Sequence, residues 1–146
     1  MRAATWTEHA LLRLRDATGR SGEARRSVVE FLGAQNCCVS AQEIHDRLRS
    51  GGARVGIASV YRALDSLDEL GLVQRVDLGD GISRFEQAHG EREHHHHLVC
   101  DDCGKVEAFE DAALERALER VAGVRGYAVG GHDVLLRGAC GSCRAA

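Results

Sequence analysis

Four of the six cysteines in the chain form two Cys-x-x-Cys pairs, Cys100 with Cys103 and Cys140 with Cys143. Pairs with this spacing are typical of sites that hold zinc tetrahedrally with four thiolates. Because such a site leaves zinc no open coordination position, the predicted role of the metal is to stabilise the fold rather than to catalyse a reaction. The alternatives are four incidental thiols or two redox-active pairs.

Four consecutive histidines, residues 94–97, directly precede the first cysteine pair. On a β-strand, successive side chains point to opposite faces, so His94 and His96 would share one face and His95 and His97 the other. One strand can then supply imidazoles to two metal sites. A leftover tag fits poorly, because the run is internal, short and followed by an apolar strand. A solvated polar strand is the remaining alternative.

The composition is that of an ordinary folded protein. The chain has 146 residues, the length of one domain or two small ones, with 44% hydrophobic and 28% charged residues. No apolar run approaches the roughly 20 residues that span a bilayer, and the N-terminus lacks the features of a signal peptide. We therefore expect a cytoplasmic protein, in which paired cysteines serve as metal ligands more often than as disulfides.

The net charge of −3 is unevenly distributed along the chain. Residues 1–88 contain 12 basic and 12 acidic residues, whereas residues 89–146 contain 7 basic and 10 acidic residues. The overall charge therefore provides no attraction for nucleic acid. Any DNA-binding surface must be a local group of arginines in the first half.

The first half has the element order of a winged helix-turn-helix domain. Apolar residues recur at helical spacing over residues 8–17 and 23–34. Ser40 and Glu43 form a capping-box pattern that opens a short third helix, and residues 57–71 predict a fourth. Two strands then flank a glycine-rich turn at residues 79–81.

The second half predicts a small α/β domain. We expect strands over residues 94–101 and 105–109, a helix over about 111–122, and final strands at 127–129 and 132–140. The sequence becomes polar around residues 89–93, and we place the domain boundary there. The predicted fold class is therefore α+β, with domains at residues 1–88 and 89–146.

The N-terminal end of the fourth helix is the candidate DNA-reading surface. In a winged helix-turn-helix, residues at this place reach base edges in the major groove. Ser59, Tyr61 and Arg62 occupy it. Arginine can pair with guanine or hold a phosphate, and tyrosine can contact thymine methyl groups. Alternatively, Tyr61 is partly in the core and Arg62 is merely solvated. Further candidates for phosphate contacts are Arg54, Arg75 and Arg84.

Several motifs together resemble the ferric-uptake-regulator (Fur) family of metal-sensing repressors. They are "IASVYRALDSLDELGLV", "RFE", "HHHHLVCDDCGKV" and the terminal "CGSC", and the resemblance runs from about residue 20 to the end. The combination is far more specific than any single motif. The four-histidine run is most similar to the zinc-uptake-regulator branch, because iron-sensing members tend to have an aspartate at its third position.

The resemblance implies a homodimeric, metal-activated repressor of operator DNA, with a DNA-binding domain followed by a dimerisation domain. The cysteine quartet matches the family's structural zinc. A regulatory site at the hinge between the domains is matched by His95 and His97, with Glu86, His89 and Cys38 as the best matches for its other ligands. A further site within the dimerisation domain is matched by His94, His96, Glu115 and His132.

The chain departs from the zinc-sensing pattern at two places. Zinc sensors often have a cysteine near residues 88–89 and an aspartate on the first wing strand, where this chain has Ala88-His89 and Gln74. Cysteine with imidazole favours zinc, whereas nitrogen and oxygen ligands alone also suit ferrous iron or manganese. Cys37 and Cys38 can also be small buried hydrophobic residues. We predict a zinc-responsive repressor, with an iron- or peroxide-responsive regulator of the same family as the alternative.

Two other classes of function fit less well. A zinc hydrolase needs an open coordination position with a general base beside it, and the sequence has no His-Glu-x-x-His motif. A metal-storage module has no use for a helix-turn-helix. We therefore expect a protein that is not an enzyme.

Overall fold

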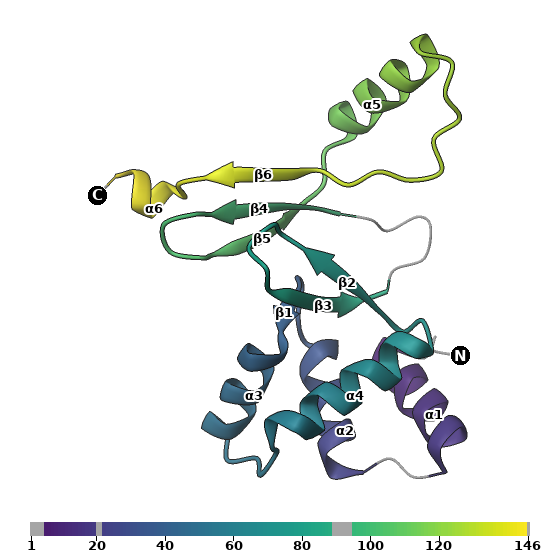
Figure 1. Cartoon of the computed structure of the whole chain (residues 1–146), viewed down its shortest axis with the longest axis vertical. Helices are drawn as coiled ribbons and strands as arrows, with labels where there is room; N and C mark the ends of the chain where they lie inside the picture. The colour runs from purple at the N-terminus through teal and green to yellow at the C-terminus, as the bar shows by residue number, and fades with distance from the viewer. Residues whose placement is uncertain (1–4, 20–21, 89–94, 146) are drawn as a thin grey trace. The chain divides into compact units, whose positions relative to one another are not determined.

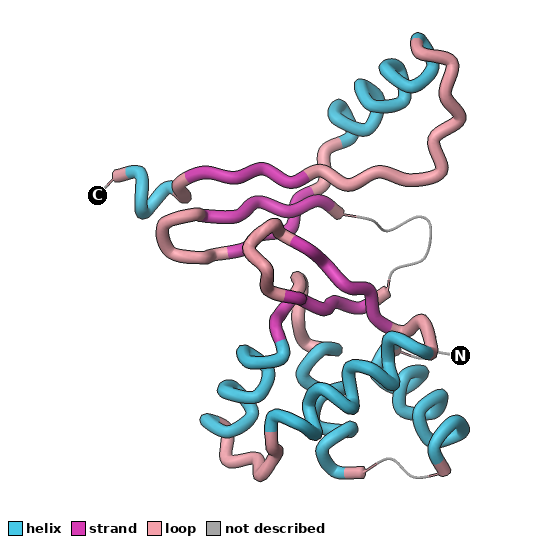
Figure 2. Tube along the Cα trace, in the orientation of Figure 1, coloured by secondary structure: helices cyan, strands magenta, loops and turns pink. Residues whose placement is uncertain are grey.

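The computed structural model describes residues 5–19, 22–88 and 95–145. The chain divides into two compact units, residues 1–89 and 90–146. The predicted domain boundary adjoins residues outside the described ranges and stays a prediction. Figure 1 labels the elements along the chain, and Figure 2 colours them by type. No described helix is both long and apolar enough to cross a bilayer.

The first unit combines helices with a small antiparallel sheet. Its described elements are α1 (Trp6–Thr18), α2 (Glu23–Gly33), β1 (Val39–Ser40), α3 (Ala41–Ser50), α4 (Ile57–Glu69), β2 (Val73–Asp77) and β3 (Ser83–Gln87). The strand order is β1-β3-β2, so the wing hairpin β2–β3 is extended by the short strand β1. The predicted winged helix-turn-helix is confirmed, with α3 and α4 as the motif. The strand β1 was not predicted, because two residues are too few for a period-2 pattern.

Local sequence explains where α3 begins and where α4 ends. The hydroxyl of Ser40 accepts a hydrogen bond of 3.1 Å from the backbone N–H of Glu43, and the Glu43 carboxylate accepts one of 2.8 Å in return. This is the predicted capping box. Gly71 follows α4 in the left-handed region with φ +67°, a conformation that costs glycine least.

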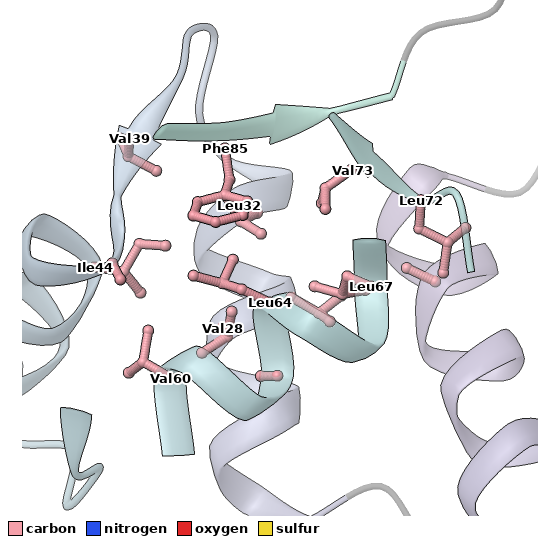
Figure 3. Close-up of a cluster of buried hydrophobic side chains, with 14 of the residues drawn as sticks. Val28, Leu32, Val39, Ile44, Val60, Leu64, Leu67, Leu72, Val73 and Phe85 are labelled. Atoms are coloured by element: carbon pink, nitrogen blue, oxygen red, sulfur yellow. The ribbon is translucent and has the colours of Figure 1, made fainter. Parts of the chain in front are cut away.

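A single hydrophobic cluster fills the space between these helices and the sheet. In Figure 3, Leu32, Leu64 and Leu67 from the helices lie beneath Val73 and Phe85 from the strands. The buried residues of α4 recur at intervals of three and four, which makes this helix amphipathic; they are Val60, Ala63, Leu64 and Leu67. One face of α4 is thus fixed in the core, and the opposite face is left for another role.

The second unit is built around the strand that carries the histidines. Its elements are β4 (His96–Cys100), β5 (Val106–Phe109), α5 (Ala112–Val124), β6 (Leu135–Gly138) and α6 (Gly141–Arg144). Strand β4 is central in the order β5-β4-β6, antiparallel to β5 and parallel to β6. The fold class predicted from the sequence, α+β, is confirmed.

Two predictions for this unit were wrong in detail. Residues 127–129 are not a strand but part of the long loop between α5 and β6 that Figure 2 shows in pink. Glycines at 126, 130 and 131 flank this segment and weaken its tendency to pair. The last strand covers residues 135–138 rather than 132–140, so His132 lies in the loop ahead of it.

Candidate metal centres and nucleic-acid interface

The four cysteine sulfurs of the predicted quartet come together at one end of the second sheet. The Sγ atoms of Cys100, Cys103, Cys140 and Cys143 all lie within 4.8 Å of one another. Cys103 Sγ is 3.8 Å from Cys140 Sγ, which matches the roughly 3.8 Å between two thiolates on a tetrahedral zinc with bonds of about 2.3 Å. The donor set therefore fits zinc.

The local backbone brings the two cysteine pairs into this arrangement. The first pair spans a turn after β4 that ends at Gly104, with φ +75°. The second pair starts α6, with Cys140 as its N-terminal cap. The backbone N–H of Cys140 lies 3.2 Å from Cys100 Sγ and, with that of Cys103, lowers the pKa of the Cys100 thiol to about 6.

The thiol of Cys143, in contrast, holds its proton more tightly than an ordinary cysteine. Hydrogen bonding with the thiols of Cys140, Cys100 and Cys103 raises the pKa of Cys143 to about 12. A metal that binds here must displace such protons, so its affinity falls as the pH falls. The quartet therefore combines a readily ionised sulfur at Cys100 with a sulfur at Cys143 that must lose its proton when a metal binds.

A second cluster of possible metal ligands lies within the same unit. Nε2 of His96 is 2.6 Å from Oε1 of Glu115, and Nε2 of His132 is 2.8 Å from Oε2 of the same carboxylate. The two imidazole ring centroids are 5.1 Å apart. His96 comes from β4, Glu115 from the first turn of α5 and His132 from the following loop. These donors suit zinc, iron or manganese.

The hydrogen bonds around His96 define which ring nitrogen carries the proton. The backbone N–H of Val134 donates to Nδ1 of His96 over 3.2 Å, so Nδ1 is an acceptor and Nε2 donates its proton to Glu115. When a metal binds Nε2 of a neutral imidazole, the ring proton must be on Nδ1. At His96 that proton would point at the N–H of Val134, which is also a donor. Metal binding at His96 therefore requires this backbone hydrogen bond to open.

The rings of His95 and His97 lie on the opposite side of the chain from that of His96. The rings of His95 and His97 lie edge to face with centroids 5.0 Å apart, whereas His96 contacts His132 and Phe109. This is the alternation expected of a β-strand. His97 is buried and His95 half-buried. The predicted ligands His89 and His94 lie outside the described residues.

Two further predicted ligands lie in the first unit. Glu86 is buried in the middle of β3, where its carboxylate accepts a 2.5 Å hydrogen bond from the amide of Gln74 on β2. Cys38 ends the loop before β1, and its thiol lies 3.9 Å from that of Cys37. The hydrogen bond with Cys37, then burial, then the negative charges of Cys37 and Glu86 raise the pKa of Cys38.

The start of α4 presents the predicted DNA-reading residues to solvent. Tyr61 is 50% exposed, so it is not a core residue. Arg62 is also exposed, and its guanidinium donates a 3.1 Å hydrogen bond to the hydroxyl of Ser59 one turn earlier. Arg54 is exposed in the loop that precedes the helix. Tyr61 and Arg62 therefore lie outside the buried stripe of α4.

The wing arginines are held by acidic partners instead. Arg75 donates to Asp68 over 2.9 Å and to Asp65 over 3.3 Å. Arg84 is buried and pairs with Asp80 across the hairpin turn at 2.8 Å. This hydrogen bonding lowers the pKa of Asp80 to about 2. Both arginines are therefore weaker candidates for phosphate contacts than Arg54 and Arg62. The sequence pattern did not reveal these pairs, because Arg75 meets its partners through the packing of β2 against α4, and Arg84 meets Asp80 through the conformation of the hairpin turn.

A winged helix-turn-helix joined to a small unit rich in clustered cysteine, histidine and carboxylate side chains defines a metal-dependent transcription regulator. The chain belongs to the Ferric uptake regulator family, whose model matches residues 17–137. Members of this family are regulators of transcription and not enzymes.

Known relatives match most of the chain. The "Ferric uptake regulation protein" of Escherichia coli K12 is 39% identical over 123 residues, which cover 82% of each chain. The structure of the Vibrio cholerae ferric uptake regulator matches with a TM-score of 0.75 and 34% identity, over 88% of this chain and 98% of that one. The Helicobacter pylori regulator, described as having three functional metal binding sites, matches with a TM-score of 0.81 and 27% identity, over 99% and 97%.

Proposed function

We propose that the protein is a zinc-responsive repressor that binds operator DNA as a homodimer in the cytoplasm. The observation that carries the DNA-binding part is the exposure of Tyr61 and Arg62 at the N-terminal end of an otherwise core-packed α4. A helix fixed on one face and open on the other is suited to entering a major groove. Ser59 orients Arg62, and Arg54 supplies a nearby positive charge for phosphate.

The metal response rests on ligands contributed by both units. In the proposal the cysteine quartet holds structural zinc, and His95 and His97 bind the regulatory metal together with Glu86, Cys38 and His89. Zinc that joins ligands from two units favours one relative orientation of the units and so changes the population able to bind DNA. His96, Glu115 and His132, with His94 as a further predicted ligand, form an additional metal site within the second unit.

Homodimerisation is supported by an uncovered apolar surface on the second unit. No residue of α5 is buried within the described chain, although the helix is amphipathic. Val124 and Tyr127 are 76% and 74% exposed, and further exposed apolar residues are Val121, Val129, Leu135 and Leu136. An apolar surface of this kind marks an interface, and a second copy is the partner that places two recognition helices on successive major grooves.

The alternative is an iron-responsive regulator of the same family. The curated relative from Escherichia coli is named a ferric uptake regulation protein. A solved structure with 30% identity and a TM-score of 0.75 is described as a "zinc-bound manganese uptake regulator". Among the described ligands, the thiol of Cys38 favours zinc, because soft sulfur donors select it over ferrous iron and manganese.

The test is to select DNA duplexes from a random library with the zinc-loaded protein and to measure affinity for the selected duplex by fluorescence anisotropy. Zinc, ferrous iron and manganese are added separately at buffered free concentrations, against a chelator control that leaves the quartet zinc in place. Zinc should give the strongest activation at the lowest free metal concentration. Activation by iron at lower free concentration than by zinc supports the alternative, and equal DNA affinity under all conditions contradicts both.

A further inference from the structure

The loop between α2 and β1 carries two adjacent cysteines whose sulfur atoms lie close together. The Sγ atoms of Cys37 and Cys38 lie 3.9 Å apart, and both residues are thiols. Cys38 is buried with 6% of its surface exposed, and Cys37 is half-buried. Packing alone would account for Cys38, but it does not require a second thiol directed at the first.

The separation of the two sulfurs fits a shared metal ion better than a disulfide. A disulfide needs an S–S distance of about 2.05 Å and a usual Cα separation of about 4.4–6.8 Å. The Cα atoms of neighbouring residues are only about 3.8 Å apart. Two thiolates bound to one tetrahedral zinc, each about 2.3 Å from the metal, lie about 3.8 Å apart. The observed 3.9 Å needs almost no adjustment.

A buried carboxylate completes a three-donor group within the first unit. An oxygen of Glu86 lies within 4.8 Å of both sulfurs. The pairing of β1 with β3, with Val39 opposite Phe85, brings the end of the cysteine loop next to Glu86. The first unit alone therefore offers two sulfurs and one oxygen from its described residues, rather than the one sulfur and one oxygen that Cys38 and Glu86 provide.

We propose that Cys37 is a second thiolate ligand of the regulatory metal and that it makes this site selective for zinc over ferrous iron and manganese. The proposal deepens the proposed function, because it rests on a regulatory metal binding at Cys38 and Glu86. The two thiolates are soft donors that zinc accepts and manganese disfavours, and the carboxylate is an oxygen ligand that zinc also binds. Each thiol gives up its proton to solvent as the metal–sulfur bond forms.

Cobalt substitution counts the thiolates directly. The full-length protein with its quartet zinc retained is titrated with Co²⁺, and the near-ultraviolet sulfur-to-cobalt charge-transfer absorbance is recorded for the wild type, Cys37→Ser, Cys38→Ser and the double variant. Zinc analysis confirms that one zinc per chain stays bound. We expect each single variant to show about half of the wild-type absorbance and the double variant none, because each variant lacks one thiolate or both.

Selectivity is measured on the same proteins by competition between zinc and manganese. Cys37→Ser should reduce the zinc-over-manganese preference by about tenfold or more, since even outer ligands of a metal change affinity by about 10–100-fold. Circular dichroism checks that each variant folds. The wild type provides an independent measurement: bound zinc should protect both Cys37 and Cys38 from alkylation by iodoacetamide, as read by peptide mass spectrometry.

The outcomes separate the inference from the function on which it rests. Wild-type absorbance equal to that of Cys37→Ser, with unchanged selectivity and Cys37 still alkylated, overturns the assignment of Cys37 even if DNA binding responds to zinc. Loss of half the absorbance with no metal response of DNA binding would instead leave Cys37 as a ligand and contradict the proposed regulatory function.

Discussion

Nε2 of His96 lies 2.6 Å from Oε1 of Glu115, although His96 is almost fully buried and the two residues come from different elements. Strand β4 brings the imidazole, and the first turn of α5 brings the carboxylate. Glu115 also contacts His132 through its other oxygen at 2.8 Å. One carboxylate thus organises both imidazoles and keeps them close enough to share a metal.

Replacing Glu115 should both destabilise the second unit and remove its additional metal. In Glu115→Ala the buried N–H of His96 loses its acceptor, at a cost of about 1–3 kcal/mol in the free energy of unfolding. Urea unfolding and metal analysis measure the two effects. Glu119→Ala, on an exposed position of the same helix, is the matched control. Equal stability and metal content for both variants would show that Glu115 has no such role.

Metal binding at His96 should open a specific backbone hydrogen bond. In the hydrogen-bonded arrangement the N–H of Val134 donates to Nδ1 of His96, and this contact is lost when Nδ1 carries the proton. The amide of Val134 should then exchange with solvent faster in the metal-loaded protein. Hydrogen exchange followed by NMR tests this, with the amide of Tyr127 as reference because its acceptor is the carbonyl of Ala122. Unchanged or slower exchange at Val134 would exclude His96 Nε2 as a ligand.

Arg62 and Arg75 should differ in their contributions to DNA binding. Arg62→Ala is expected to weaken binding to selected DNA by about 1–3 kcal/mol if the guanidinium reads a base edge, and to reduce discrimination against random DNA. Arg75→Ala should cost less, because Asp65 and Asp68 already neutralise this side chain. Anisotropy titrations on selected and random duplexes give the comparison. A larger loss for Arg75→Ala would place the interface on the wing rather than on α4.

In the first unit, the helices and the wing could be predicted from local sequence more fully than the geometry of the sites. The cap at Ser40 and the apolar spacing of α4 depend on residues within a few positions of one another, so both could be predicted. The approach of Cys37 to Glu86 depends on the pairing of β1 with β3, and a two-residue strand leaves almost no pattern. The hydrogen bond from Gln74 to Glu86 likewise follows from the register of β2 with β3.

In the second unit the alternation of the histidines was predictable, but the position of His132 was not. Period-2 alternation follows from strand geometry alone. His132 contacts Glu115 from a loop that contains neighbouring glycines. Glycine allows many backbone conformations, so no sequence pattern predicts where this loop places His132. The sequence therefore indicated the partners of His96 through family resemblance rather than through local structure.

The pair of Asp80 and Arg84 predicts a pH dependence of stability. Hydrogen bonding to Arg84 holds the pKa of Asp80 at about 2, below its ordinary value of 3.8. A carboxyl whose pKa is lowered by folding stabilises the protein above its ordinary pKa, and this contribution is lost as the pH falls toward the folded value. Asp80→Asn should lower the midpoint of thermal unfolding at pH 6, and its difference from wild type should shrink between about pH 4 and 2. Asp77→Asn, at the end of β2 just before this turn, is the control. A difference between Asp80→Asn and wild type that does not change with pH would contradict the pair's role.

Substitutions on the two faces of the histidine run should have different effects, one on zinc-dependent DNA binding and the other on stability. His95 shares its face with His97, the proposed ligands of the regulatory metal, whereas His96 is directed to Glu115 and His132. We expect zinc to raise the DNA affinity of the wild type by about 5–150-fold, the range typical of coupled sites. His95→Ala should abolish this increase while leaving the quartet zinc and the unfolding midpoint in place. His96→Ala should lower the midpoint but retain most of the increase, because its ring lies on the other face of β4.

By reciprocity, DNA must tighten zinc binding by the same factor in each protein. Anisotropy titrations with and without zinc, together with zinc titrations with and without DNA, measure both sides of this relation. Equal loss of coupling in the two variants would contradict the assignment of separate roles to the two faces.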